Sequence, residues 1–586
     1  MIAGFDFGTT NSLISVVVRD RVIDVFDDEE GRPHPSVVRY EGEEVIVGRE
    51  ARDALEEVGL GVHGTTVRSP KFLLGKEVVN VGGVDRSPVD IVADVIRHVR
   101  SESLQSQRGV LGSLDRAVVT IPVSMDGPRR AALREAFARA GISVAQFVHE
   151  PLAALYGYLR GAADSESEIR GLMRRNVLVV DWGGGTLDLT LCRIEPGRIL
   201  QLRNGGTDQV GGDKFDQVIR DEVVKRFSIE HGISETDHPM RDARLRLLRA
   251  TEKNKIALSD RAEATFYSRD YFPESGTTLE YTLSRQELDA ITRPLVAQGI
   301  REVEALFDSV GMAPAQVSLC LVAGGMAAMP SIRSRLHELF GPERVHVPAT
   351  SATLVSQGAG WIAHDSQRLV LAKQIELEMA RGSRLPLLRA GTRMPGDGEE
   401  RQEGFHLYCT DPTDGIAKFP IVAPSQLSEQ PQASDPRTTL GVVAIAVDHT
   451  APPLVERLEL DVQIDQDLIL SVNASSSQRK DQSSSSYFDL EFGIGLPGSN
   501  MQEFLDVADA GAWTGGGGLA IRANVADQKN AALIPGDVLH KHNPGAFARL
   551  SDQATQEQLT EHLYYQPCAV CKRQWGDPAC RCGSVA

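Results

Sequence analysis

Two short stretches decide the fold of this chain: DFGTTNS at residues 6–12 and DWGGGTLD at residues 181–188. Each follows or ends an apolar, strand-like run, so we interpret the two as copies of one hairpin. Small residues in such a hairpin let backbone N–H groups approach phosphate oxygens, and a carboxylate at the strand end can hold hydrated Mg²⁺. Two hairpins that face each other are therefore expected to hold one nucleotide between two lobes.

The bulk composition limits the classes of protein that fit. A chain of 586 residues is too long for one hydrophobic core, so several domains are expected. The formal net charge of −18 argues against a general nucleic-acid binder. No apolar run approaches the ~20 residues that span a bilayer, and the first residues lack a signal-peptide pattern. We expect a cytoplasmic protein with neither nucleic acid nor membrane as a partner.

Residues 1–365 alternate strand-like and helix-like segments. This alternation predicts an α/β architecture with helices covering the sheets, and two phosphate hairpins within it suggest two related halves. The expected strands are 2–7, 12–18, 116–120, 177–181 and 187–192. The expected helices are 89–103, 127–140 and 212–229.

The pattern changes after residue 375. Short apolar runs separated by Pro, Gly and Asp predict an all-β sandwich over residues 375–498, preceded by a linker at 366–374. Its expected strands are 385–388, 405–408, 440–448, 458–464 and 468–474. The serine-rich residues 475–486 are expected to form a flexible loop. Residues 499–586 are expected to form a small α and irregular C-terminal region.

The two hairpins and four further segments resemble the seventy-kilodalton heat-shock chaperones of the actin and sugar-kinase superfamily. These segments are RSPKFLLG at 68–75, HEPLAALYG at 149–157, GGDKFD at 211–216 and LVAGG at 321–325. The resemblance implies a two-lobed, actin-like ATPase domain over residues 1–365 that uses ATP and Mg²⁺.

The resemblance also implies roles for individual residues. Lys71 would lie against the γ-phosphate and position the attacking water, and Glu150 would orient that water or act through it as a base. Asp6 and Asp181 would hold Mg²⁺ through water, and Thr186 would act with them at the catalytic end. The phosphate-binding and ribose-flanking positions carried over are Gly8, Thr9, Thr10, Asn11, Gly183, Gly184, Gly185, Gly211, Gly212, Gly324 and Gly325.

The adenosine end matches the family less well. Three residues of the purine-contacting helix are retained on one helical face: Glu252, Lys255 and Ser259. Ile256 and Ala328 stand where the family has two arginines that sandwich the adenine, and an apolar wall through Ile256 and Met326 would replace them. Loss of two planar cation contacts, each worth about 0.5 to 2 kcal/mol, predicts weaker or less selective nucleotide binding and leaves the rate of hydrolysis open.

The β-rich region resembles the substrate domain of the same family, in the segments at 385–388, 391–395, 452–453 and 458–474. The resemblance implies capture of unfolded or extended polypeptide clients, with a J-domain co-chaperone and a nucleotide-exchange factor as further partners. Pro122 and Arg130 match a proline and an arginine implicated in signalling between the domains.

Four cysteines crowd the last twenty residues: Cys568, Cys571, Cys580 and Cys582. Their C-x2-C and C-x-C pairs can close a tetrahedral Zn²⁺ site, with His562 as a substitute ligand. Redox pairing and free thiols stay open as alternatives.

The expected function is that of an ATP-dependent chaperone that captures and releases polypeptide segments. One alternative is a nucleotide-gated scaffold or sensor with little hydrolysis and a dedicated partner. Another is a small-molecule kinase on the same fold, against which the β-sandwich counts.

Overall fold

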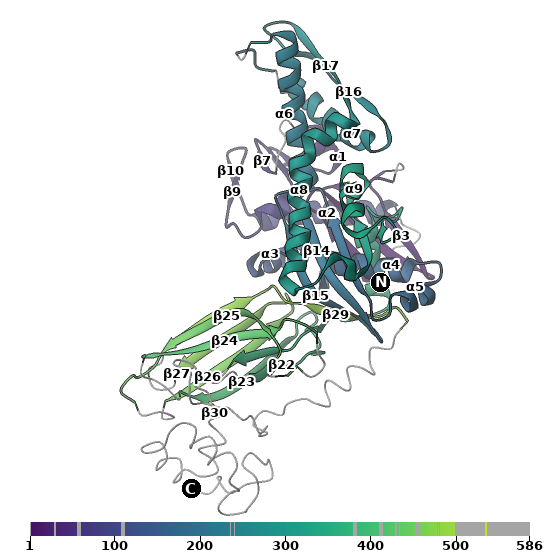
Figure 1. Cartoon of the computed structure of the whole chain (residues 1–586). Helices are drawn as coiled ribbons and strands as arrows, with labels where there is room; N and C mark the ends of the chain where they lie inside the picture. The colour runs from purple at the N-terminus through teal and green to yellow at the C-terminus, as the bar shows by residue number, and fades with distance from the viewer. Residues whose placement is uncertain are drawn as a thin grey trace, which may run out of the picture. The chain divides into compact units, whose positions relative to one another are not determined.

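The computed structural model describes residues 2–498, except for short gaps, and residues 534–535 (Figure 1). The gaps are at 29–30, 56–59, 107–111, 235, 240, 379–383, 410–413, 428–430, 433, 452–455, 477–478 and 480. The chain divides into two compact units, Met1–Arg368 with Ile494–Ser499 and Leu369–Gly493 with Asn500–Ala586. Nearly all of the expected C-terminal region, including its four cysteines and His562, lies outside the described residues.

The first large sheet of the first unit contains the DFGTTNS hairpin. Its main strands, in spatial order, are β12 (Ser143–His149), β11 (Arg116–Ile121), β1 (Ile2–Phe7), β2 (Asn11–Val18) and β3 (Arg21–Val25). Strand β1 is parallel to β11 and antiparallel to β2. A short sixth strand, β4 (His34–Pro35), also pairs with β2. The hairpin between β1 and β2 is thus fixed at the centre of the sheet.

A second sheet repeats this arrangement around the DWGGGTLD hairpin. Five of its strands run in the order β19 (Val345–His346), β18 (Val317–Ala323), β13 (Asn176–Trp182), β14 (Leu187–Glu195) and β15 (Arg198–Thr207). Strand β13 is parallel to β18 and antiparallel to β14, as β1 is to β11 and β2. The two hairpins therefore occupy equivalent positions in two related halves, as the sequence predicted.

Helices α4 (Glu150–Gly161) and α10 (Leu354–His364) pack against each other and against strands of both halves. Their backbones meet where Gly157 lies against Gly358, and a Cβ added to Gly358 would clash with the carbonyl oxygen of Ala153. Glycine at this crossing is required by the close approach. Because Glu150 is the first residue of α4, this packing fixes its position.

The remaining helices and small sheets complete the first unit. Its longer helices are α2 (Pro88–Ser106), α3 (Gly127–Arg139), α6 (Gly212–His231), α7 (Arg241–Asp260), α8 (Arg285–Val310) and α9 (Pro330–Phe340). Shorter helical segments are α1 (Arg49–Asp53), α5 (Ser165–Leu172), η1 (Pro70–Leu73), η2 (Pro314–Gln316) and η3 (Gly325–Ala328). The small sheets use β5 (Val37–Glu41), β6 (Glu44–Val47), β7 (Gly61–His63), β8 (Thr66–Arg68), β9 (Val79–Val81), β10 (Val84–Arg86), β16 (Glu263–Phe272) and β17 (Thr277–Ser284).

The described residues of the second unit form strands and no helix. One antiparallel sheet has the order β22 (Arg384–Leu388), β21 (Ile375–Glu378), β24 (Ile416–Pro424) and β25 (Arg437–Ala446). The other has β28 (Gln482–Tyr487), β27 (Leu470–Ser476), β26 (Arg457–Asp465), β23 (Glu400–Tyr408) and β30 (Ile534–Pro535). A further pair joins β20 (Val370–Leu371), inside the expected linker, to β29 (Phe492–Gly495).

Side chains along β26 alternate between buried and half-buried, with Leu458, Leu460, Val462 and Ile464 fully buried. This period of two is the pattern of a strand with one face in a core. The prediction of a flexible serine-rich loop was wrong, because residues 482–487 form β28 and pair in register with β27. Pairing with a neighbouring strand outweighs the weak strand preference of serine.

Candidate nucleotide site

The two glycine hairpins face each other across a narrow gap. A Cβ added to Gly184 would clash with the side chain of Thr10, and one added to Gly185 would clash with Thr9. Glycine is needed at both positions because any side chain would push the hairpins apart. The backbones of both hairpins can therefore approach one ligand bound between them.

A cavity of about 270 Å³ opens between the hairpins. Most of the predicted binding residues line it: Asp6, Gly8, Thr9, Thr10, Asn11, Glu150, Asp181, Gly183, Gly184, Gly185, Thr186, Gly212, Glu252, Lys255, Gly324 and Gly325. The structure thus brings together residues that lie more than 300 positions apart in the sequence.

Lys71 and Glu150 form a buried ion pair, with 3.0 Å between Nζ and Oε1. Lys71 lies in η1, which follows Ser69 in the left-handed conformation (φ 56°) and has Pro70 as its first residue. The lysine lines an adjoining cavity of about 280 Å³, and the two cavities share Thr9 and Thr186. The ammonium group of Lys71 and the carboxylate of Glu150 are therefore held together beside the two hairpins.

Buried carboxylates gather beside this ion pair. Burial, with the nearby charge of Glu150, raises the pKa of Asp6 to about 7, although Thr120 donates a hydrogen bond of 2.8 Å to it. Burial and Glu150 likewise raise the pKa of Asp181 well above its usual range and that of Asp188 to about 7. Oxygen ligands with excess negative charge suit Mg²⁺, so Asp6 and Asp181 fit the predicted metal.

The opposite end of the cavity carries a second charged network. Lys255 pairs with Asp216 at 2.9 Å and donates a hydrogen bond of 3.2 Å to the carbonyl oxygen of Gly212. Burial pushes the pKa of Glu252 upward, but the nearby charges of Arg52, Lys255 and Arg68 together outweigh it and hold that pKa below its usual value. Lys255 and Glu252 of α7 are thus each held in place by a charged partner on another helix.

The apolar wall expected at the adenine end lies on the same cavity. Ile256 and Met326 both line it, and Ile256 is 60% exposed while Met326 is buried. An exposed isoleucine at the mouth offers contact area to a base but no cation. Ala328 is exposed and is not among the residues that line the cavity.

Some predicted residues lie outside the cavity. Gly211 sits directly behind Gly185, so it supports the hairpin rather than the cavity wall. The carbonyl oxygen of Ser259 accepts a hydrogen bond of 3.2 Å from Arg285, and Ser259 does not line the cavity. Pro122 lines the adjoining cavity beside Lys71. Arg130 is fully buried in α3 and donates a 2.7 Å hydrogen bond to the carbonyl oxygen of Met125.

Two charged residues of the cavity, Asp213 and Asp216, were not predicted from the sequence. Asp213 forms a buried ion pair with Arg68 and accepts a hydrogen bond of 3.4 Å from the hydroxyl of Thr10. Both aspartates stand in the first two turns of α6, three residues apart, directly after the pair Gly211–Gly212. Their spacing on one helical face was the available signal.

The duplicated sheets, the facing hairpins and the cavity between them define a first unit made of two related α/β halves. A family model described as "Hsp70 protein" matches residues 2–364. The chain belongs to the Hsp70 family. Its α/β architecture over that range agrees with the predicted actin-like fold.

Several curated relatives extend the similarity. A "Chaperone protein DnaK" of Thermosipho melanesiensis is 31% identical over 348 residues, which are 58% of this chain and 55% of that protein. The proteins of the same name from Ureaplasma parvum serovar 3 and Ureaplasma urealyticum serovar 10 are 28% and 29% identical over 501 and 502 residues. These alignments cover 83% of this chain and 77% and 78% of the two proteins. The similarity therefore continues beyond the residues of the family match.

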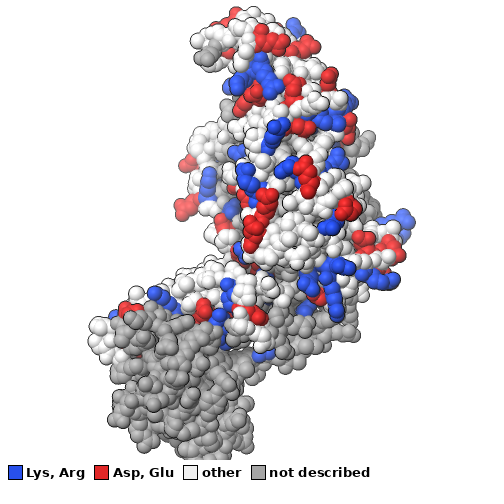
Figure 2. All heavy atoms as spheres, in the orientation of Figure 1, with Lys and Arg blue, Asp and Glu red and all other residues white. Residues whose placement is uncertain are grey.

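Two further features of the described residues concern the length and hydropathy of the helices and the charges on the surface. None of the helices in this part of the chain has both the length and the apolar character needed to cross a bilayer. On the face shown in Figure 2, Lys and Arg lie interspersed with Asp and Glu among the described residues.

Proposed function

We propose that this chain is an ATP-driven chaperone in which the first unit binds and hydrolyses Mg-ATP. The observation that carries the proposal is the buried Lys71–Glu150 pair at the end of a cavity lined by both hairpins. Phosphoryl transfer to water needs a positioned nucleophile and neutralised charge rather than covalent help from the protein. Lys71 and Glu150 can position the attacking water, and Lys71, together with a metal ion held by the neighbouring aspartates, can neutralise the phosphate charge.

The residues divide this work by their places around the cavity. The backbone N–H groups and hydroxyls of Thr9, Thr10 and Thr186 would hold the phosphate oxygens. Lys71 would position the attacking water beside the γ-phosphate, and Glu150 would orient it or accept its proton. Mg²⁺, held through water by Asp6 and Asp181, would supply positive charge to the phosphates. Gly324 and Gly325 would flank the nucleoside.

The second unit is proposed to bind extended polypeptide segments. Its two antiparallel sheets would form the β-sandwich expected at 375–498, with 366–374 as the linker from the nucleotide-binding domain at 1–365. Backbone hydrogen bonds to an extended segment and an apolar side-chain pocket would provide affinity and selectivity. The relatives named chaperones, aligned over more than 80% of this chain, support this assignment.

Nucleotide would control the clients by shifting an equilibrium between two conformations, with ATP favouring release and hydrolysis favouring capture. Arg130, which is buried in α3 with its charge near His149, the residue before Glu150, would be one member of a route for this signal. Pro122, beside Lys71 on the adjoining cavity, would be the second member of the route. A J-domain co-chaperone and a nucleotide-exchange factor are the expected further partners, and the cytoplasm is the proposed compartment.

Single-turnover hydrolysis of ATP tests the catalytic assignment. Lys71→Ala should lower the rate at least about 100-fold, because the water loses its positioning charge and Glu150 is left buried without its partner. Lys76→Ala is the matched control, since Lys76 is exposed five residues further on and should leave the rate unchanged. Equal rates for wild type and Lys71→Ala would refute the role of Lys71.

Addition of an unfolded, apolar peptide tests the chaperone assignment. The peptide should raise the hydrolysis rate of the wild type, and Mg-ATP should speed release of a fluorescent peptide already bound. Hydrolysis that is indifferent to peptide would leave an ATPase without the proposed control of clients. If peptide binding depends on nucleotide but the protein does not hydrolyse ATP, the chain would instead be a nucleotide-gated scaffold.

A further inference from the structure

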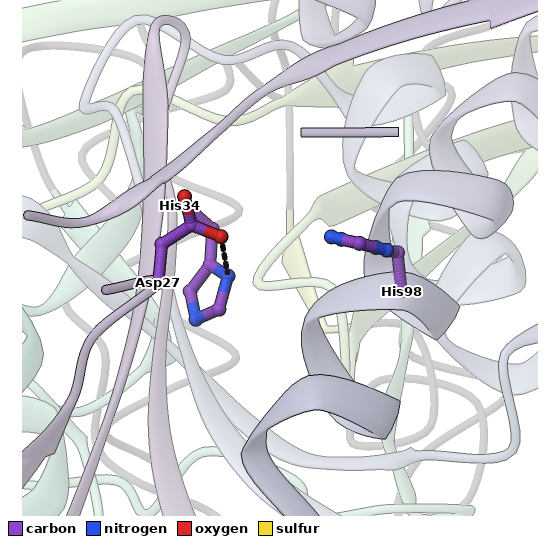
Figure 3. Close-up of side chains that lie close together, drawn as sticks. All are labelled: Asp27, His34 and His98. Carbon is purple, nitrogen blue, oxygen red and sulfur yellow. Dashed lines mark ion pairs between the residues drawn. The ribbon is translucent and has the colours of Figure 1, made fainter. Parts of the chain in front are cut away.

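Three side chains with metal-ligand chemistry meet at a place separate from the nucleotide cavity. Asp27 follows β3, His34 begins β4, and His98 lies within α2. One ligand atom from each lies within 4.8 Å of those of the other two. Figure 3 shows His98 pointing from its helix toward Asp27 and His34, which are joined by an ion pair. Three segments of the chain therefore direct two imidazoles and one carboxylate to a common point.

His34 is the most deeply buried member of this cluster. Its side chain is 1% exposed, and its Nδ1 lies 3.1 Å from Oδ1 of Asp27. Figure 3 shows this Nδ1, and not Nε2, on the side of Asp27, and neither nitrogen makes a hydrogen bond of normal geometry to the described residues. A buried polar nitrogen without a partner is destabilising by about 1–3 kcal/mol, so its presence in a core position requires a reason. Binding a metal ion gives an imidazole nitrogen such a partner.

Arg49 orients the carboxylate of the cluster. Its Nε donates a hydrogen bond of 2.9 Å to Oδ2 of Asp27, and its guanidinium also pairs with Asp28. The other oxygen of Asp27, Oδ1, faces His34. Ligating carboxylates and histidines are commonly fixed by such outer contacts. Asp27 is thus held with one oxygen directed into the cluster.

We propose that Asp27, His34 and His98 bind one Zn²⁺ ion. Two imidazoles and one carboxylate form a ligand set that zinc prefers, with water in the fourth position of a tetrahedron. Bonds of about 2.0–2.2 Å require the ligand atoms to lie closer together than 4.8 Å. His98 is half-buried, and its side chain would have to rotate toward Asp27 and His34 to bring a nitrogen within this distance.

The site would anchor a segment that supports the first phosphate hairpin. His34 pairs with Ser12 in the β2–β4 ladder, and the hydroxyl of Ser36 donates a hydrogen bond of 2.9 Å to the carbonyl oxygen of Gly8. Pro33, next to His34, lines the nucleotide cavity. Zinc would therefore fix β4 to α2 and so hold the hairpin in place.

Metal analysis of the full chain tests the proposal once the tail cysteines are removed as competitors. The parent protein carries Cys568→Ser, Cys571→Ser, Cys580→Ser and Cys582→Ser, is stripped with chelator, and is then equilibrated with Zn²⁺ and desalted. One equivalent of zinc per chain is expected. The change His98→Ala should abolish it, and His337→Ala, which removes another half-buried helical histidine, should retain it.

Two measurements guard against loss of metal through misfolding. Far-UV circular dichroism and the melting temperature in chelator should be the same for the parent and for His98→Ala, whereas Zn²⁺ should raise the melting temperature of the parent alone. Titration with Co²⁺, followed by its visible absorption, should show about 10–100-fold weaker binding when Arg49→Gln removes the outer contact. Absence of zinc from the parent, or equal zinc in the parent and His98→Ala, would overturn the proposal.

Discussion

The residues at the two ends of the cavity offer a nucleotide different kinds of contact. The phosphate end has the buried pair Lys71–Glu150, two buried aspartates and the half-buried Asp6, so charge and hydrogen bonds dominate there. The adenine end has Ile256 and Met326, which offer only apolar contact. Affinity for the phosphates should therefore exceed the contribution of the base.

Restoring a cation at the adenine end tests this contrast. The change Ile256→Arg should raise affinity for ADP roughly 2- to 30-fold, because a guanidinium over an aromatic base contributes about 0.5 to 2 kcal/mol. Isothermal titration with ADP provides the measurement, and base-free tripolyphosphate provides the control. Equal gains for both ligands would assign the effect to charge attraction and contradict the stacking explanation.

His149, the residue before Glu150, should make stability depend on pH. Burial, with the charge of Arg130, lowers its pKa from 6.5 to about 3 in the folded protein. The unfolded chain therefore binds one more proton between these two values, and the free energy of unfolding falls as pH falls below 6.5. Between pH 7 and pH 5.5, His149 should remove about 1 kcal/mol of stability.

Urea unfolding at both pH values measures the effect. The buried aspartates of the cavity have raised pKa values and act in the opposite direction, so the comparison is made between the wild type and His149→Gln. The wild type should lose about 1 kcal/mol more than the variant on acidification. Parallel pH profiles would show that the pKa of His149 is the same in the folded and the unfolded protein, which contradicts the prediction.

Individual residues also show what the sequence could predict. Lys71, Glu150 and the hairpin residues stand in short, ordered motifs, so the sequence could single them out together. The structure brings the hairpin residues and Glu150 to one cavity, with Lys71 paired to Glu150 beside it. Their roles in binding and hydrolysis stay predictions. Asp27, His34 and His98 lie in three unrelated segments with no metal-binding spacing. Only the folding of β4 against β2 and α2 brings them together, which no local pattern indicates.

At the scale of elements, the two hairpins can lie this close together only because Gly184 and Gly185 have no side chain. The expected strands of the first 365 residues were confirmed within a few residues because they are strongly apolar and buried on both faces. In contrast, β28 consists mainly of serine with alternating exposure, and its pairing partner β27 decides its conformation. Local preference is informative where burial is strong and fails at exposed edge strands.

The change Gly184→Ala tests the close approach of the hairpins. The new methyl group would clash with Thr10, so the hairpins must separate and phosphate affinity should fall at least about 10-fold. Gly183→Ala is a matched control, because a Cβ at Gly183 has its nearest neighbour, the carbonyl oxygen of Thr186, at an ordinary contact distance of 3.6 Å. Binding of Mg-ADP, followed by titration calorimetry, compares the two. Equal losses would show that the effect comes from glycine flexibility and not from the spacing of the hairpins.

For the whole molecule, two compact units suggest that nucleotide stabilises one of them selectively. All residues of the nucleotide cavity belong to the first unit. A ligand that binds only the folded state stabilises it by about 2.7 kcal/mol at a concentration 100 times its dissociation constant. Differential scanning calorimetry should therefore show that Mg-ADP raises the melting temperature of the first unit by several degrees.

The melting transition of the second unit reports whether the units communicate. If nucleotide acts on the first unit alone, the second transition should stay at its original temperature. The proposed nucleotide control of clients requires more, because ligand that alters the peptide-binding unit must also alter its stability. We therefore expect Mg-ATP, added to the Lys71→Ala variant to prevent hydrolysis, to shift the second transition as well, and Mg-ADP to shift it less. Identical second transitions with ATP, ADP and no nucleotide would contradict the coupling while leaving nucleotide binding intact.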